Sequence, residues 1–214
     1  SDNVKANRNG QNFFINNRFV RSRTAQAALE QAFIPGSVLS ISNSAFEGCT
    51  SLVSANVPES VKSAVSAFDG CSSLESLTVP FVGGSVKWET DENQYPFGYI
   101  FGGTSVEGTT AIYQYYKKLS TGVFSRTVYA VPSSIRSVTV TGTTVGDCAF
   151  YGCSWLTSIT LSPNTTQIGI DTFALGKNLT NFTIPAGVTY IGSGAFSGCE
   201  RLTELTLPSG LREL

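Results

Sequence analysis

The chain has 214 residues, of which only 14% are charged, and its 14 basic and 15 acidic side chains give a net charge of −1. This composition excludes the basic stripe that binds nucleic acids and the polybasic patch that binds anionic lipids. No apolar run is long enough to insert across a membrane, and the absence of histidine removes the usual general base near neutral pH.

The first segment differs from everything that follows it. It opens on the polar run SDNVKANRNG, so we expect no signal peptide in it, and the mature form of an exported protein would look the same. The stretch TAQAALEQAF at 24–33 predicts a short helix that Thr24 caps and Pro35 and Gly36 stop. Because the terminal coil of a repeat array needs a cover, we expect residues 1–37 to form an N-terminal cap.

From residue 45 onward, one eight-residue phrase recurs. It reads AFEGCTSL at 45–52 and AFDGCSSL at 67–74, and it returns at 149–156 and 195–202, with a worn copy, TFALGKNL, at 172–179. A fixed period of this size is the signature of a repeat architecture. The anchoring phenylalanines follow one another at steps of 22, 82, 23 and 23 residues: Phe46, Phe68, Phe150, Phe173 and Phe196.

Each copy runs into a second phrase, such as LESLTVP at 74–80. Its last two apolar residues alternate with polar ones, so both point to one face of a strand. Stacked coils bury that face, and their leucines and phenylalanines become continuous interior ladders. A glycine in most copies suits a tight corner: Gly48, Gly70, Gly152 and Gly198. The predicted strands are 52–57, 74–79, 135–140, 156–161, 179–184 and 202–207.

Over residues 38–214, these phrases resemble the BspA-like leucine-rich repeats, whose coils read roughly I-x-x-x-A-F-x-G-C-x-x-L-x-x-I-x-I-P. The resemblance implies a leucine-rich-repeat solenoid, α/β in class but rich in β-structure, with about six coils of 22–23 residues in a curved parallel sheet. It also implies a protein of bacterial or protist cell surfaces that takes part in adhesion and binds host proteins.

Four of the five cysteines occupy the same position of the repeat, namely Cys49, Cys71, Cys153 and Cys199. We interpret them as reduced core residues, because buried cysteine commonly acts as a small hydrophobe. Neighbouring coils lie about 4.8 Å apart, so Cys49 and Cys71 could approach bonding distance. A bond between Cys49 and Cys71 or between Cys148 and Cys153 is the alternative. The sequence contains no C-x-x-C pair that would indicate zinc.

The 82-residue step indicates an insertion at 81–132 in one coil. Residues 99–103 (YIFGG) resemble a degenerate repeat phrase, so the coil opens between Phe101 and its strand. Two β-branched and aromatic runs separated by residues 119–122 predict a hairpin over 110–131 in which Lys118 pairs with Val123. One face then carries Tyr113, Tyr115, Lys117, Phe124, Arg126 and Val128, and the other Ile112, Gln114, Tyr116, Lys118, Val123, Ser125, Thr127 and Tyr129.

Two further segments complete the chain. The acidic run at 89–92 is interpreted as a solvated loop, since it lacks the spacing of a calcium loop. Residues 211–214 (LREL) match 188–191 and begin another coil. We therefore expect either a longer array or a partner that covers this edge.

No catalytic constellation, phosphate-binding glycine motif or metal-ligand spacing is visible, so we expect no enzyme, no cofactor and no metal. The predicted function is a non-catalytic extracellular or cell-surface module that binds a host or neighbouring-cell protein or glycan. The alternative is a structural spacer that displays another domain. Self-association through the hairpin edge or the uncapped C-terminal coil is a further expectation.

Two surfaces are candidates for binding. The outward residues of the strands form a neutral hydroxyl strip, which cross-strand pairing alone explains. The insertion is free of the constraints of stacking and concentrates the residue types of interface hot spots. The predicted binding residues are Tyr113, Tyr115, Tyr116, Lys117, Lys118, Phe124, Arg126 and Tyr129.

Overall fold

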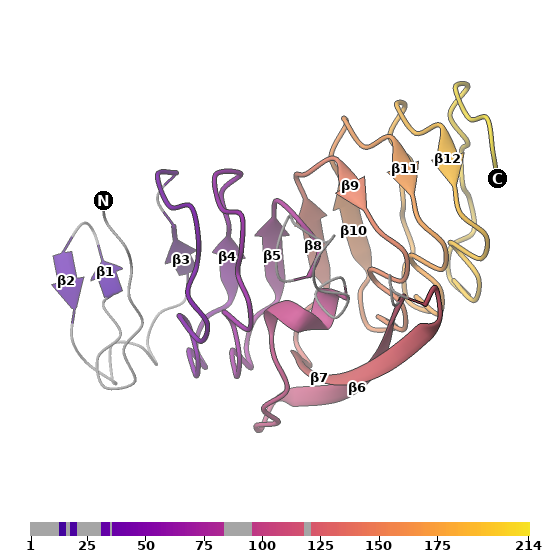
Figure 1. Ribbon diagram of the computed structural model, residues 1–214. Coiled ribbons are helices and arrows are strands. Elements are labelled where there is room, and N and C mark those ends of the chain that lie inside the picture. Colours follow the sequence, from indigo (N-terminus) through magenta and orange to yellow (C-terminus); the bar gives the residue numbers. More distant parts are fainter. Residues whose placement is uncertain (1–12, 16–17, 21–30, 35, 84–95, 118–120) are drawn as a thin grey trace.

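The computed structural model describes residues 13–15, 18–20, 31–34, 36–83, 96–117 and 121–214. Its backbone winds into stacked coils, whose strands lie side by side along the length of the molecule (Figure 1). The predicted solenoid is confirmed. Within the described residues, no helix has the length and apolar character needed to span a membrane.

The main sheet contains five parallel strands in the order β10-β8-β5-β4-β3. Equivalent residues of successive coils face each other in register, for example Ser54 with Ser76 and Ser76 with Ser137. Four of the predicted strands are therefore present, although each is shorter than predicted. The strands are β3 (Gln31–Phe33), β4 (Ser54–Asn56), β5 (Ser76–Val79), β8 (Ser137–Val140) and β10 (Ser158–Leu161).

A second parallel sheet forms where each coil leads into the recurrent phrase, and the sequence analysis did not predict it. Its order is β12-β11-β9, with strands β9 (Thr144–Val145), β11 (Gln167–Ile168) and β12 (Tyr190–Ile191). One buried residue of each strand faces the core: Val145, Ile168 and Ile191. A bridge between Tyr190 and Glu213 continues this sheet, which confirms that residues 211–214 begin another coil.

The phenylalanines form the predicted interior ladder. Phe68, Phe150 and Phe173 are at most 1% exposed, whereas Phe46 and Phe196 are partly buried. The rings stack between coils, with centroids 5.1 Å apart for Phe46–Phe68, 5.8 Å for Phe150–Phe173 and 5.3 Å for Phe173–Phe196. Large aromatic surfaces therefore connect each coil to the next.

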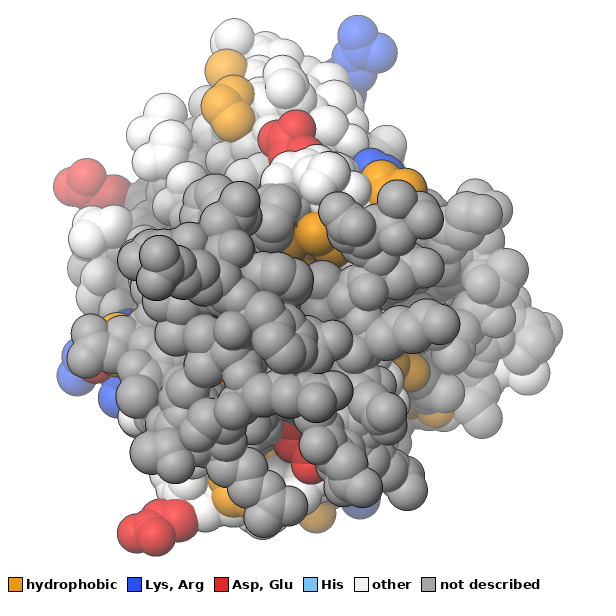
Figure 2. Space-filling model, turned by 90° about the vertical axis from the view of Figure 1, so that its left-hand side faces the viewer, with side chains coloured by type: hydrophobic (Ala, Val, Ile, Leu, Met, Phe, Trp, Pro, Cys, Tyr) orange, Lys and Arg blue, Asp and Glu red, His pale blue; other side chains and the backbone are white. Residues whose placement is uncertain are grey.

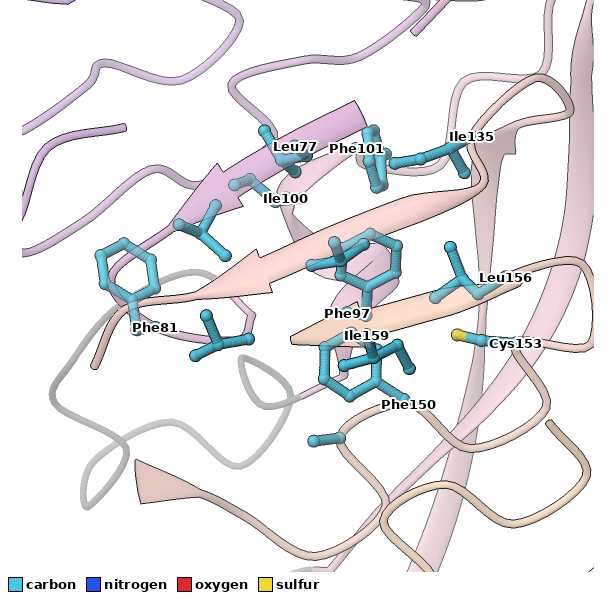
Figure 3. Packing of buried hydrophobic residues seen from close by; sticks show 14 of the residues in the cluster. Leu77, Phe81, Phe97, Ile100, Phe101, Ile135, Phe150, Cys153, Leu156 and Ile159 are labelled. Atoms are coloured by element: carbon cyan, nitrogen blue, oxygen red, sulfur yellow. The ribbon is translucent and has the colours of Figure 1, made fainter. Parts of the chain in front are cut away.

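The inserted chain fills the break in this ladder with the 3₁₀ turn η2 (Phe97–Ile100). The Phe68 N–H donates to the Ile100 carbonyl (3.1 Å). One coil earlier, the Phe46 N–H donates to the Ala67 carbonyl in the same way. Phe97 in turn donates to Ala149 (2.8 Å). The Phe97 ring lies among the buried residues close to Phe101 and Phe150 (Figure 3). The degenerate coil predicted at 99–103 is thus confirmed.

The corner of each repeat requires a positive φ angle. The predicted corner glycines all have φ between 70° and 72°, a region that glycine enters without steric cost. Leu175 holds the same place in the worn copy and still adopts φ 62°. The coil geometry therefore imposes the conformation even where the favourable residue is missing. The glycines are Gly48, Gly70, Gly152 and Gly198.

The helix predicted over 24–33 is wrong at its end, because residues 31–33 form β3 of the main sheet; residues 24–30 lie outside the described residues. Leu29, Ala32 and Ile34 precede Leu52, Ala55 and Val57 by one period of 23 residues. Parallel pairing with β4 outweighs the local helix propensity. The solenoid thus begins before residue 38, and the described part of the predicted cap includes an antiparallel pair, β1 (Phe13–Ile15) with β2 (Arg18–Val20).

The last two predicted strands are wrong or incomplete. Residues 202–207 are not in a strand, and the segment 179–184 makes a single bridge, between Asn181 and Ser158. Phe182 occupies a place where earlier coils carry smaller residues such as Ile159, and its ring packs against Phe173 (4.8 Å) and Phe196 (5.3 Å). We attribute the loss of pairing to this larger ring, because it fills the space that would let the last coil close on its neighbour.

Candidate binding surface

The insertion folds as an antiparallel hairpin of β6 (Thr109–Lys117) and β7 (Phe124–Pro132), which lies across the turns of the solenoid (Figure 1). Its register places Tyr113 opposite Val128 and Lys117 opposite Phe124. The next pair in this register would be Lys118 with Val123, as predicted, although Lys118 lies outside the described residues. The acidic run at 89–92 does so as well.

The inner face of the hairpin is part of the core. Ile112, Gln114 and Tyr129 are all buried, Gln114 completely. The Gly98 N–H donates to Gln114 Oε1, and Gln114 Nε2 donates to the Tyr151 carbonyl at 3.0 Å. One glutamine therefore ties the hairpin both to η2 and to the coil beyond the break.

Tyr129 was predicted as a binding residue, and the structure corrects this. Its side chain is only 5% exposed and packs edge-on against Tyr99 at 6.0 Å. A Cβ atom at Gly98 would lie 2.5 Å from Tyr129 Cβ, so the close packing requires glycine there. The predicted register correctly placed Tyr129 on the same face of the hairpin as Ile112 and Gln114. Only the packing shows that this face points inward.

The outer face is open to solvent. Tyr113 is 58% exposed, Val128 42% and Phe124 40%. The guanidinium of Arg126, which is also exposed, lies over the Tyr113 ring with its Cζ atom 5.1 Å from the centroid. This cation–π contact holds both side chains in place on the surface.

The remaining predicted residues lie at the margins of this surface. Tyr115 is half-buried, and its ring meets Tyr151 edge-on at 4.8 Å. Tyr116 is also half-buried, and Lys117 is the last residue of β6. We call the outward-facing set the hairpin outer face, defined as the exposed residues Tyr113, Phe124, Arg126 and Val128 together with the half-buried Tyr115.

The hydroxyl strip is also present. Ser54, Ser76, Ser137 and Ser158 form one row across the sheet, and Asn56, Thr78, Thr139 and Thr160 form the next. Such cross-strand pairs stabilise a sheet without any partner. Figure 2 views the molecule from the end that carries β1 and β2, where the charged side chains of the described residues are scattered rather than gathered in a patch.

One buried acid, Asp69, lies in the turn that follows Phe68, and no sequence motif had singled it out. It is 7% exposed, and its Oδ1 atom has no hydrogen-bond partner among the described residues. Burial, and to a smaller extent the charge of Glu47 in the preceding coil, raises the pKa of Asp69. Gly102 lies against this carboxyl, since a Cβ there would be 3.0 Å from Asp69 Oδ2. In the described part of the chain, no group of three or more potential metal ligands is found.

A groove separates the last two coils. Its walls are the extended segments 180–184 and 203–209, the same segments that fail to pair as strands. The groove is lined by hydroxyl, amide, carboxylate and apolar side chains, among them Asn181, Phe182 and Glu204.

Comparison with protein families shows six copies of the BspA type leucine rich repeat region, in residues 23–87 and 117–214. Among solved structures, a leucine-rich repeat protein from Bacteroides ovatus ATCC 8483 is 18% identical over 90% of this chain and 48% of that one, with a TM-score of 0.44. One from Eubacterium ventriosum ATCC 27560 is 18% identical over 86% of this chain and 45% of that one, with a TM-score of 0.47.

A leucine rich cell surface protein from Faecalibacterium prausnitzii A2-165 is 22% identical over 86% of this chain and 55% of that one, with a TM-score of 0.38. The chain thus spans about half the length of these three structures. The comparison with curated proteins found no match.

Proposed function

Since the chain belongs to the BspA-type leucine-rich repeat family, we propose that it is a non-catalytic binding module of a secreted or cell-surface protein. It recognises a protein or glycan of a host or a neighbouring cell through the hairpin outer face. The observation that carries this proposal is the contrast between the two faces of the hairpin. The inner face is locked into the core by Gln114, whereas Tyr113, Phe124 and Val128 are 40–58% exposed.

This arrangement supports binding for a physical reason. Exposed aromatic side chains on a rigid support lose little conformational entropy when a partner covers them, so most of the gain from burial is kept. A hairpin on its own is only marginally stable, and the hydrogen bonds at 98 and 151 supply the missing rigidity. A rod that only separates other domains has no need of such a surface.

The spacer is the second candidate, and the hydroxyl strip is the observation that favours it. Rows of serine, asparagine and threonine in register stabilise the sheet and offer no anchor for a partner. In that case the hairpin serves only to cover the break in the phenylalanine ladder.

The test compares the chain with an outer-face variant, Tyr113→Ser, Phe124→Ser and Val128→Ser together, on an array of host matrix proteins and glycans. Deleting residues 110–131 would be a poor test, because it would expose the core that Ile112, Gln114 and Tyr129 now cover. The matched control removes exposed polar groups from the hydroxyl strip, Asn56→Ala with Thr160→Ala.

We expect the outer-face variant to lose capture of the array ligands while its circular dichroism spectrum and melting temperature stay close to those of the unmodified chain. The strip control should keep capture. Capture that survives in the outer-face variant and disappears in the control would assign binding to the strip. Failure of every protein, including the unmodified chain, to bind the array would favour the spacer.

A further inference from the structure

The charges of the chain are unevenly distributed. Residues 109–132 contain three basic residues and no aspartate or glutamate, whereas the rest of the chain has eleven basic and fifteen acidic residues. The hairpin is therefore a positively charged ribbon on an otherwise acidic protein. Charge complementarity of this kind selects partners and speeds their association.

Arg126 is arranged to receive an anion. Its guanidinium lies over the Tyr113 ring, and a stacked guanidinium still presents the N–H groups at its edge. Those N–H groups match a carboxylate, which they bind through two parallel hydrogen bonds. The contact with Tyr113 also restricts the side chain before any partner arrives, which reduces the entropy that binding costs.

The rest of the outer face suits a polypeptide better than a neutral sugar. The five residues of the hairpin outer face include no carboxylate or carboxamide, and their side-chain acceptors are the hydroxyl groups of Tyr113 and Tyr115, so few acceptors are available for the many hydroxyl groups of a glycan. Val128 and Phe124 offer apolar surface on either side of Arg126 along β7. This two-residue alternation matches the spacing of side chains on an extended peptide.

The edges of the hairpin also favour an extended peptide as the partner. Among the described residues, β6 and β7 pair only with each other. Ala130, near the C-terminal end of β7, donates its N–H to the Gly102 carbonyl at 3.0 Å. The segment 124–128 lies further along the strand, on the side of the hairpin loop. An extended chain can add to a strand edge through backbone hydrogen bonds.

We propose that the hairpin outer face binds an extended acidic segment of a partner protein, in which apolar and acidic residues alternate. Its carboxylates pair with Arg126, and its apolar side chains cover Tyr113, Phe124 and Val128. This inference rests on the proposed function, since it names the chemistry of the partner that the same surface would take.

The experiment measures fluorescence anisotropy of a labelled synthetic decapeptide of alternating glutamate and valine, added to the full chain. A decapeptide of alternating lysine and valine and a heparin oligosaccharide are the comparison probes. We expect the acidic peptide to bind, the basic peptide not to bind, and the affinity for the acidic peptide to fall as salt is added, because ions screen exposed charges. Arg126→Glu should weaken binding by about tenfold or more.

The matched control is Arg201→Glu, which makes the same change of charge at an exposed arginine of the last complete coil. It should alter the affinity by less than about twofold, since a distant rim charge contributes little at moderate salt. Equal effects of the two substitutions would show a general charge effect and overturn the inference. So would equal binding of both peptides, or heparin that binds more tightly than the acidic peptide and depends on Arg126.

Self-association is tested in the same samples by analytical ultracentrifugation. A dimer that forms without peptide and disappears in Arg126→Glu would assign the surface to a second copy of the chain and overturn the inference. The two proposals fail separately. If the outer-face serine variant loses capture on the array while the acidic peptide binds nothing, binding stands and the acidic partner is wrong. If the peptide binds and array capture does not depend on the outer face, the proposed function is wrong.

Discussion

The repeated cysteine has a role that its apolar character alone does not explain. Cys71 Sγ donates to the Phe46 carbonyl at 3.0 Å, and Cys199 Sγ donates to the Phe173 carbonyl at 3.3 Å. Each of these two thiols thus donates a hydrogen bond to the backbone carbonyl of a phenylalanine in the preceding coil. A disulfide would remove that donor. None of the five cysteines, all of which lie in the described part of the chain, forms a disulfide.

We therefore predict five thiols per chain when the protein is titrated with a thiol reagent in denaturant without reductant. In the native state the reaction should be slow, because a hydrogen bond with Cys49 raises the pKa of the Cys71 thiol and burial raises that of Cys153. A count of three or fewer would show a bond, for which Cys49–Cys71 and Cys148–Cys153 are the first pairs to examine.

Asp69 should make the stability of the fold depend on pH. Its pKa is raised in the folded chain, so the folded state holds the proton at pH values where the unfolded state has lost it. The stabilisation is complete below the unfolded pKa of about 3.9 and is lost as the pH rises through the folded pKa. We expect Asp69→Asn, which cannot ionise, to become more stable relative to the unmodified chain as the pH rises from about 4 toward neutrality.

The measurement is the melting temperature of both proteins across this range. The exposed residue Glu59 provides the control, and Glu59→Gln should leave the pH dependence unchanged. A difference between Asp69→Asn and the unmodified chain that stays constant with pH would mean that Asp69 ionises normally in the folded protein.

At the scale of the elements, the main sheet ends at the coil that carries Phe182. Successive strands carry Ala55, Leu77, Val138 and Ile159 at this position, and pairing is complete among them. The next coil places an aromatic ring there, and the sheet is reduced to the bridge at Asn181. We infer that a side chain of the wrong volume interrupts the hydrogen bonds of a backbone whose sequence phrase is intact.

Replacing Phe182 by Ile, the residue of the preceding strand, should let the last coil close on its neighbour. We expect slower amide hydrogen exchange in residues 181–184 and 203–207, because backbone groups that now line the groove would pair. Mass spectrometry of the exchanged protein measures this directly. Unchanged or faster exchange in both segments would show that the groove has another cause.

For the whole molecule, the phenylalanine ladder connects coils that otherwise contact only their neighbours. Phe173 is the most connected ring of the C-terminal half, since it packs against Phe150, Phe182 and Phe196. Its removal creates a cavity that affects three coils at once. In a solenoid the effect should remain local, because stability is a sum of coil and neighbour terms.

We predict that Phe173→Ala lowers the free energy of unfolding by about 3–5 kcal/mol, measured by urea denaturation. Hydrogen exchange should increase first around residues 150–196, while the coils of β4 and β5 keep their protection. The control is Phe124→Ala on the hairpin outer face, which should cost about 0.5 kcal/mol or less. Equal loss of protection in both halves would mean that the solenoid unfolds as one cooperative unit.

The sequence by itself determined the architecture, because a coil that stacks on identical coils needs the same residue types at the same places. The steps between Phe46, Phe68, Phe150, Phe173 and Phe196 predicted the ladder, and the alternation in residues 110–131 predicted the hairpin with its register. These features are local or periodic, so they are visible without knowing what lies nearby.

Tertiary structure alone decided three other features. Residues 31–33 are a strand because β4 lies beside them, although their local pattern favours a helix. Residues 202–207 are not in a strand, which we attribute to the ring of Phe182 in the neighbouring coil. Tyr129 is core and Tyr113 is surface because one face of the hairpin meets Gly98 and the turn at 151. In each case the outcome depends on contacts between segments far apart in the chain, which no local pattern contains.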